Sequence, residues 1–272
     1  ALLVFHSFLV LFGKVNMDNY FLVVLPSSDP LIVSFVVITF FIAGIVKGFL
    51  GLGLPAAVMA LLTLIMEPTD AISIIFLPLL FTNFVQFYRS SNRISTAIKF
   101  RYFALALMIS ILVTSAFITS YPKSLLTILI GLAMIVFSIQ SFFGLKIPVK
   151  DSIVWHVTFG IFSGFLGGIS TIWSPPIAMY LMARDYRKEE FIGILGFLFF
   201  AACFPLGIGL YLAGVLTVNS ALASLCGLIF VLLGFRVGEI LRLLVAQKRF
   251  KKILLTAFFV MGLRLILITI ID

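Results

Sequence analysis

The chain has 272 residues, of which 62% are hydrophobic and 11% are charged, and its mean hydropathy is +1.27. Charged residues make up about a quarter of a typical soluble domain, so this composition excludes a soluble globular protein and predicts an all-α polytopic membrane protein. The net charge of +9 does not indicate nucleic acid as a partner, because the basic residues lie in short segments between apolar runs and not on one continuous face.

Residues 1–30 form the first segment of the chain. Its opening apolar run is interrupted at Lys14, well short of the roughly 20 residues that a spanning helix needs. No basic region precedes the run, as a secretory signal peptide would require. We therefore expect an N-terminal segment that lies at the membrane interface, although the sequence leaves open whether residues 1–25 cross the membrane.

An eight-residue pattern occurs twice, 116 positions apart. Gly44–Gly51 reads GIVKGFLG and Gly160–Gly167 reads GIFSGFLG, so six of the eight residues are identical. Further glycine or hydroxyl residues and then a proline follow each copy. These residues break a helix, because proline lacks a backbone donor and glycine tolerates irregular dihedral angles. The pattern predicts two repeats, residues 31–145 and 152–271, each beginning with a broken or re-entrant helical hairpin.

Segment lengths predict that the second repeat is inverted. Residues 31–66 contain 36 residues with one charge, Lys47, which is too long for one spanning helix and short for two. Residues 152–183 repeat this pattern without any charge. Counting each hairpin arm as a segment gives five segments per repeat, and an odd number reverses the orientation of the second repeat. The other segments are expected at residues 71–88, 102–122 and 124–145, twice within 191–235, and at 253–271.

Charges between the segments predict the topology. Residues 89–101, 146–151, 184–190 and 236–252 together hold 15 of the 19 basic residues and 5 of the 10 acidic ones. Cytoplasmic loops carry the excess of lysine and arginine. We therefore place these four loops on the cytoplasmic side and both ends of the chain on the other side.

The two breaks predict an anion site. A helix break at membrane depth is tolerated only where it is buried in protein or faces a polar cavity, and the N-terminus of the short helix that follows favours a negative charge. Glycines spaced by four residues also allow two helices to pack closely, so both interpretations stay open for them. The candidate substrate-binding residues at the breaks are Gly48, Gly51, Gly53, Pro55, Gly164, Gly167, Gly168, Ser170, Thr171 and Ser174.

Four polar residues within the apolar segments are further candidates. Lys47 is costly in a membrane unless it meets water, an anion or the interface, so it either binds substrate or extends to the membrane surface. Arg264 lies about 16 Å into the last segment by helical rise and either serves the anion or pairs within the bundle. Asn83 and Gln86 share one helical face and either line a polar cavity or join helices by hydrogen bonds.

Residues for catalysis or metal binding form no recognisable pattern. His6 and His156 are far apart, and Cys203 and Cys226 lie in apolar segments without metal-ligand spacing. We therefore predict no enzyme activity, no metal and no cofactor, and an intramembrane enzyme is the least favoured alternative. A scaffold subunit would instead have dry, well-packed breaks.

The segment Gly44–Gly53 with Pro55, its second copy before Pro175 and the basic loop after the third segment resemble the TauE/SafE family of sulfite exporters. The resemblance covers Leu31–Ile271. It implies a secondary transporter that moves sulfite, an organosulfonate or another small sulfur-containing anion across the bacterial cytoplasmic membrane by alternating access. It also implies coupling to a proton or ion gradient, whereas a passive anion channel is the alternative. Membrane lipids are expected partners, and a homodimer is left open.

Overall fold

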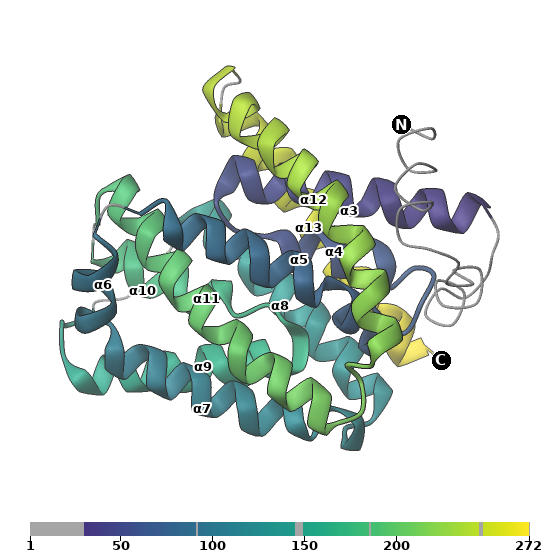
Figure 1. The fold of residues 1–272 in the computed structure, drawn as a ribbon, viewed down its shortest axis with the longest axis horizontal. Helices are drawn as coiled ribbons and strands as arrows, with labels where there is room; N and C mark the ends of the chain where they lie inside the picture. The colour runs from purple at the N-terminus through teal and green to yellow at the C-terminus, as the bar shows by residue number, and fades with distance from the viewer. Residues whose placement is uncertain (1–29, 91, 145–148, 185, 245–246, 272) are drawn as a thin grey trace, which may run out of the picture.

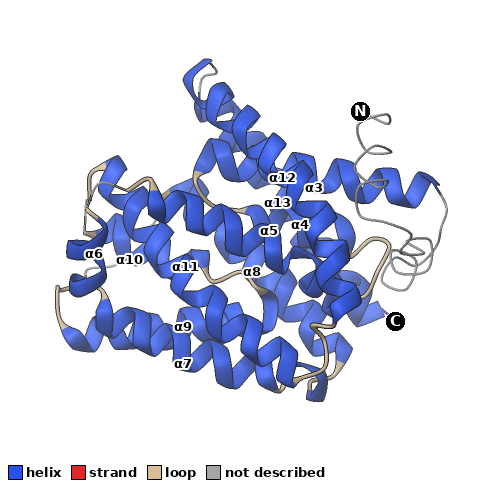
Figure 2. Ribbon diagram, viewed as in Figure 1, coloured by secondary structure: helices blue, strands red, loops and turns tan. Residues whose placement is uncertain are grey.

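The computed structural model describes residues 30–90, 92–144, 149–184, 186–244 and 247–271, and in these residues it contains helices and no strand (Figure 2). The predicted interfacial segment, residues 1–30, lies outside the described residues except for its last residue. The helical class predicted from composition is confirmed for the part of the chain that the structure describes.

The helices follow the predicted segments closely. The first half contains α3 (Pro30–Leu50), α4 (Leu54–Leu62), α5 (Pro68–Tyr88), α6 (Arg93–Lys99), α7 (Arg101–Ala116), the 3₁₀ helix η1 (Ile118–Ser120) and α8 (Lys123–Phe143). The second half contains α9 (Ile153–Ser170), α10 (Ser174–Ala183), α11 (Lys188–Leu212), α12 (Val218–Leu244) and α13 (Gln247–Ile271). The short helix α6 lies within a stretch that was expected to be only a loop.

Six of the described helices are long and apolar enough to cross a membrane, namely α3, α5, α8, α9, α11 and α12. Helices α6 and α7 together form a further candidate that is bent by 71° between them. The apolar part of α13, Leu255–Ile271, is shorter. These lengths confirm the prediction of a polytopic membrane protein.

The first predicted break separates α3 from α4. Helix α3 ends at Leu50, and Gly51 and Gly53 adopt φ angles of 79° and 92°. Glycine reaches this left-handed region without the steric cost that a Cβ atom imposes. Pro55 then occupies the first turn of α4, where the missing N–H has no intrahelical acceptor to lose.

The second predicted break separates α9 from α10. Helix α9 continues to Ser170, which is one turn further along its repeat than the end of α3 at Leu50. Gly167 and Gly168, which were expected in the break, therefore lie inside α9. Thr171 leaves the helix with a φ of 60° and is the non-glycine residue with positive φ among those that the structure describes. A β-branched residue rarely adopts this conformation, so the second break is closed under backbone strain.

Glycines set the closest helix contacts, and they do so in the same way in both halves. A Cβ atom on Gly44 or Gly48 would collide with the backbone of α12 at Phe235, and one on Gly160 or Gly164 would collide with α7 at Leu107. Contact positions rise together along both pairs of helices, so α3 runs parallel to α12 and α9 runs parallel to α7. The packing role that spacing of four predicts is therefore present at these four glycines.

Helices in matching positions of the two halves pack antiparallel. Along α5 and α11, which lie side by side (Figure 1), Gly193 meets Ser90 whereas Gly207 meets Phe76. Along α8 and α13, Gly131 meets Ile266, whereas Phe137, which is later in α8, meets Phe258, which is earlier in α13. Helices α8 and α13 are therefore also antiparallel. Helices α5 and α11 are the most buried of the six candidate spans, so they form the centre of the bundle, and they follow the short helices α4 and α10 respectively.

Candidate functional site

Lys47 lies in the last turn of α3, and its side chain points into the bundle. The residue is only 1% exposed, so the ammonium group does not extend to the membrane surface. Its Nζ atom donates a hydrogen bond to Oδ1 of Asn83 on α5 and lies 5.1 Å from the ring centroid of Phe199 on α11. An aromatic face attracts a cation, so the two central helices both stabilise this charge.

Asn83 links Lys47 to α11. The residue is fully buried, and its Nδ2 atom donates to Sγ of Cys203 at 3.6 Å. The Cys203 thiol in turn donates to the carbonyl oxygen of Phe199 at 3.1 Å. One turn away on the same face, Gln86 donates to the carbonyl oxygen of Ile192 at 3.0 Å. The two amides that sequence analysis grouped on one face of α5 therefore both bond across to α11.

Lys47 meets no carboxylate among the described residues. The ion pairs that the structure describes lie elsewhere: Lys123 with Glu67, Arg89 and Arg236 with Glu239, and Asp151 with Lys99, His156 and Arg184. A buried ammonium group whose partners among the described residues are an amide oxygen and an aromatic ring keeps an uncompensated charge. A small anion would supply the missing negative charge.

Hydroxyl groups close the second break. Ser170 is 1% exposed, and its Oγ atom accepts a hydrogen bond from the N–H of Ile172 at 3.1 Å and donates to the carbonyl oxygen of Leu166 at 2.6 Å. Thr171 donates through Oγ1 to the carbonyl oxygen of Ser170 at 2.5 Å. Ser174, at the start of α10, is also buried. The three hydroxyl candidates therefore lie together around this break.

Trp173 connects the second break to Lys47. Its ring is 1% exposed and lies 6.0 Å from the Phe199 ring, edge to face. Phe199 also carries the Lys47 ammonium on its face. Trp173 packs so closely on Gly167 that a Cβ atom there would lie 2.7 Å from the indole ring. A residue from each break thus reaches the same aromatic side chain at the centre of α11.

Sequence analysis did not select Phe199 or Ser163. Phe199 is one of 31 phenylalanines in the chain, so its residue type carries no signal. Ser163 did offer one, because it occupies the position in the second repeat that Lys47 occupies in the first. Its Oγ atom is buried and has no hydrogen-bond partner among the described residues. The same is true of Thr39 Oγ1 on α3.

Three of the glycine candidates pack against neighbouring helices. Gly48 packs on α12, and Gly164 and Gly168 pack on α7, where a Cβ on Gly168 would collide with Thr114. Arg264 lies half-buried on α13 and forms no hydrogen bond or ion pair with another described residue. The structure therefore groups Lys47, Asn83 and Gln86 with α11 and does not bring Arg264 into that group.

Three comparisons place the chain among known proteins. The family model for the sulfite exporter TauE/SafE matches residues 36–265, which include both breaks and the Lys47–Asn83 pair. No curated protein and no solved structure matches the chain. The family match extends over most of the sequence and agrees with the resemblance that the two glycine-rich breaks indicated. The chain therefore belongs to the TauE/SafE family of sulfite exporters.

Proposed function

We propose that the protein is a secondary transporter of small anions, with sulfite or an organosulfonate as substrate, and that Lys47 is the charged group that holds the anion. Family membership implies membrane transport of an anion. The observation that carries the site is the buried Lys47 ammonium, which has neutral partners only among the described residues. An anion beside it would turn an unfavourable buried charge into a charge-assisted hydrogen bond.

The surroundings of Lys47 suit a small oxyanion. Asn83 fixes the ammonium group in place, and the Phe199 ring covers one side of it. The first N–H groups of α4 and α10 have no acceptor within their own helices, and they carry the positive end of the helix dipole. The hydroxyls of Ser170, Thr171 and Ser174 provide further donors at the second break. We expect oxygen atoms of the anion to replace the hydrogen bonds that now close this break.

The arrangement of helices supports two inverted repeats and alternating access. Helices α5 and α11 are antiparallel, as are α8 and α13, and the broken helix of each half packs on the other half, α3 on α12 and α9 on α7. A two-fold axis in the membrane plane would produce this exchange. Lys47 and Trp173 are each only 1% exposed, so access requires one set of helices to move relative to the other. We place this transporter in the bacterial cytoplasmic membrane, coupled to a proton or ion gradient.

Transport by purified protein in liposomes tests the site. We expect uptake of labelled sulfite, sulfate or a small organosulfonate by the wild type, and a reduction of about 10- to 100-fold in Lys47→Met, since a hydrogen bond to a charged group contributes about 1.5–3 kcal/mol. The matched control is Lys123→Met, because Lys123 is an exposed lysine paired with Glu67. If Lys47→Met transports the anion at the wild-type rate, Lys47 does not bind the anion.

An imposed gradient separates a transporter from a passive channel. With a pH gradient across the liposome membrane, a coupled transporter accumulates the labelled anion above its external concentration, and a protonophore abolishes this accumulation. A channel brings the concentrations only to electrochemical equilibrium. Equilibration without accumulation, for every ion gradient tested, would contradict the coupled mechanism while leaving Lys47 as an anion contact.

A further inference from the structure

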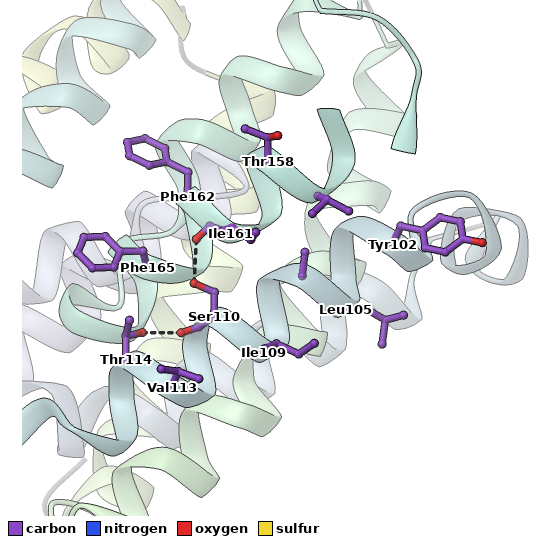
Figure 3. Close-up of a pocket in the computed structure, with 12 residues that line it drawn as sticks. Tyr102, Leu105, Ile109, Ser110, Val113, Thr114, Thr158, Ile161, Phe162 and Phe165 are labelled. Atoms are coloured by element: carbon purple, nitrogen blue, oxygen red, sulfur yellow. Dashed lines mark hydrogen bonds between the residues drawn. The ribbon is translucent and has the colours of Figure 1, made fainter. Parts of the chain in front are cut away.

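A long apolar groove lies between α7 and α9 on the outside of the bundle (Figure 3). Its volume is about 930 Å³. One wall is formed by Leu105, Ile109 and Val113 of α7, and the other by Ile161, Phe162 and Phe165 of α9. All six side chains are exposed. The groove therefore opens on the surface that faces lipid in a membrane-spanning protein.

Close packing of the two helices creates the groove. Gly160 and Gly164 bring α9 against α7, so the larger side chains stand on either side of a narrow floor. The polar atoms on the floor are engaged, since Ser110 Oγ donates to the carbonyl oxygen of Ile161 at 2.8 Å and Thr114 Oγ1 donates to that of Ser110 at 2.8 Å (Figure 3). The surface left for a ligand along this floor is apolar.

The groove has the length of one lipid leaflet. It extends along α7 from Tyr102 to Thr114, which corresponds to about 18 Å at 1.5 Å per residue. Half of the hydrocarbon core of a bilayer is about 15 Å. The two lengths are similar, so the groove suits one acyl chain from a single leaflet.

Positive charge lies at the Tyr102 end of the groove. The Arg101 guanidinium stacks 4.7 Å from the Tyr102 ring centroid, and its Nη2 atom lies 3.4 Å from the Tyr102 hydroxyl. Arg93, at the start of α6, stacks in the same way on Tyr88 at 4.8 Å. Neither arginine pairs with a carboxylate among the described residues, and residues 89–101 contain no acidic residue. This charge suits a phosphate group.

Helix α6 is placed to lie at the membrane surface above this end. It turns by 71° from α7 and buries none of its residues. Ile94 and Ile98, one turn apart, are 78% and 57% exposed. A short helix with exposed apolar and basic side chains lies in the boundary between headgroups and acyl chains. Arg93 and Arg101 would then lie at headgroup depth.

We propose that the groove and Arg101 form a binding site for an anionic phospholipid. One acyl chain lies between α7 and α9, and the phosphate group contacts Arg101. The apolar lining selects the chain, and the arginine selects a headgroup with net negative charge over a zwitterionic one. This site is separate from the buried Lys47 site, so its test does not depend on which anion is transported.

Native mass spectrometry of the purified protein tests the proposal. The protein is incubated with equal amounts of phosphatidylglycerol and phosphatidylcholine, and the lipid retained by each copy is identified. We expect preferential retention of one phosphatidylglycerol, and a preference about fivefold weaker in Arg101→Gln, the effect expected for one basic residue near an anionic headgroup. Arg236→Gln is the control, because Arg236 lies on α12 and pairs with Glu239.

A second variant tests the groove itself. Ile109→Trp adds bulk at an exposed position of the wall and should reduce retention of both lipids, whereas Arg101→Gln should lower only the preference between them. Equal retention of the two lipids by the wild type, or an unchanged preference in Arg101→Gln, would overturn the proposal. So would a protein dimer that carries no lipid and is dissociated by Ile109→Trp, because a second copy would then occupy the groove.

Discussion

The two helix breaks occupy matching places in the two halves of the chain but are built from different chemistry. At the first break, Gly51 and Gly53 adopt positive φ angles and the preceding turn carries Lys47. At the second, Thr171 adopts the positive φ and Ser170 provides the hydrogen bonds, with no charged residue nearby in the sequence. The first break thus has a charged residue beside it, whereas the second has hydroxyl groups.

This difference is clearest at the fourth position of the repeated motif. Lys47 Nζ is bound to Asn83 and covered by Phe199, whereas Ser163 Oγ is buried without a partner among the described residues. Two lysines at these positions would place two like charges in one bundle, and the carboxylates in the described ion pairs bind other residues. At the proposed anion site, a single cation would attract the anion with the energy of one charge pair, so the anion could still be released. Both breaks therefore join a long helix to a short one through residues with positive φ, but only the first is preceded by a charged residue.

The largest effect on anion transport is expected when a carboxylate inside the protein pairs with the Lys47 ammonium. Asn83→Asp would place a carboxylate where the amide now accepts from Lys47, so the ammonium group would be paired without substrate. We expect anion transport in liposomes to fall at least about tenfold, since a charge-assisted hydrogen bond is lost to the substrate. The thermal unfolding midpoint in detergent should stay the same or rise.

Asn83→Leu is the matched variant. It removes the hydrogen-bond acceptor of Lys47 without supplying a charge, which leaves the ammonium group buried and unpaired. A hydrogen bond to a charged group contributes about 1.5–3 kcal/mol, so the unfolding midpoint should fall. Normal transport by Asn83→Asp would show that the Lys47 charge does not hold the anion.

The next effect concerns charge at the second break. Ser163→Lys would bury a second ammonium group at a fully buried position, which costs about 3 kcal/mol at the centre of a membrane helix. We expect lower yield and a lower unfolding midpoint. Ser163→Ala is the control and should leave stability almost unchanged, because the serine hydroxyl has no partner to lose among the described residues. If Ser163→Lys is as stable as the wild type, position 163 tolerates a buried ammonium group as well as position 47 does.

Much of the fold could be predicted from the sequence because its signals are local. Glycine, proline and long apolar runs act on the backbone within a few residues, so both breaks and most helix positions were predicted. Helix α6 was missed because it has only seven residues and buries none of them. Its orientation is set by the 71° bend between α6 and α7, which the local sequence does not indicate.

The site was less predictable because its contacts are long-range. Lys47 stood out as a charge within an apolar run, but its choice of Asn83, 36 residues away, depends on how α3 packs against α5. Gly164 and Gly168 illustrate the same limit, since glycine serves a break and a helix contact equally well. Phe199 became relevant only when the structure showed that Lys47 and Trp173 both reach its ring.

A smaller effect is expected from the backbone of the two breaks. Gly53→Ala would force a Cβ atom into a φ of 92°, and that atom would lie 3.2 Å from a methyl group of Val46. The left-handed conformation alone costs about 1–2 kcal/mol for a residue with a side chain. Thr171→Asn should lose less, because asparagine tolerates this region better than a β-branched residue, which offsets the loss of the hydrogen bond from Thr171 Oγ1 to the Ser170 carbonyl oxygen. Calorimetry of both variants in detergent checks this contrast, which fails if Gly53→Ala is as stable as the wild type.

The smallest effect is expected from Ser170→Ala. Its Oγ atom accepts from the N–H of Ile172 at 3.1 Å, so alanine leaves a buried donor unpaired at a cost of about 1 kcal/mol. Ser138→Ala is the control, since Ser138 is equally buried but only donates to the carbonyl oxygen of Met134 in its own helix. If the second break supplies hydroxyl donors to the anion, Ser170→Ala should also weaken the apparent affinity for transport, and Ser138→Ala should not. Equal transport by the two variants would restrict Ser170 to closing the break, and would leave the first break as the source of both charge and affinity.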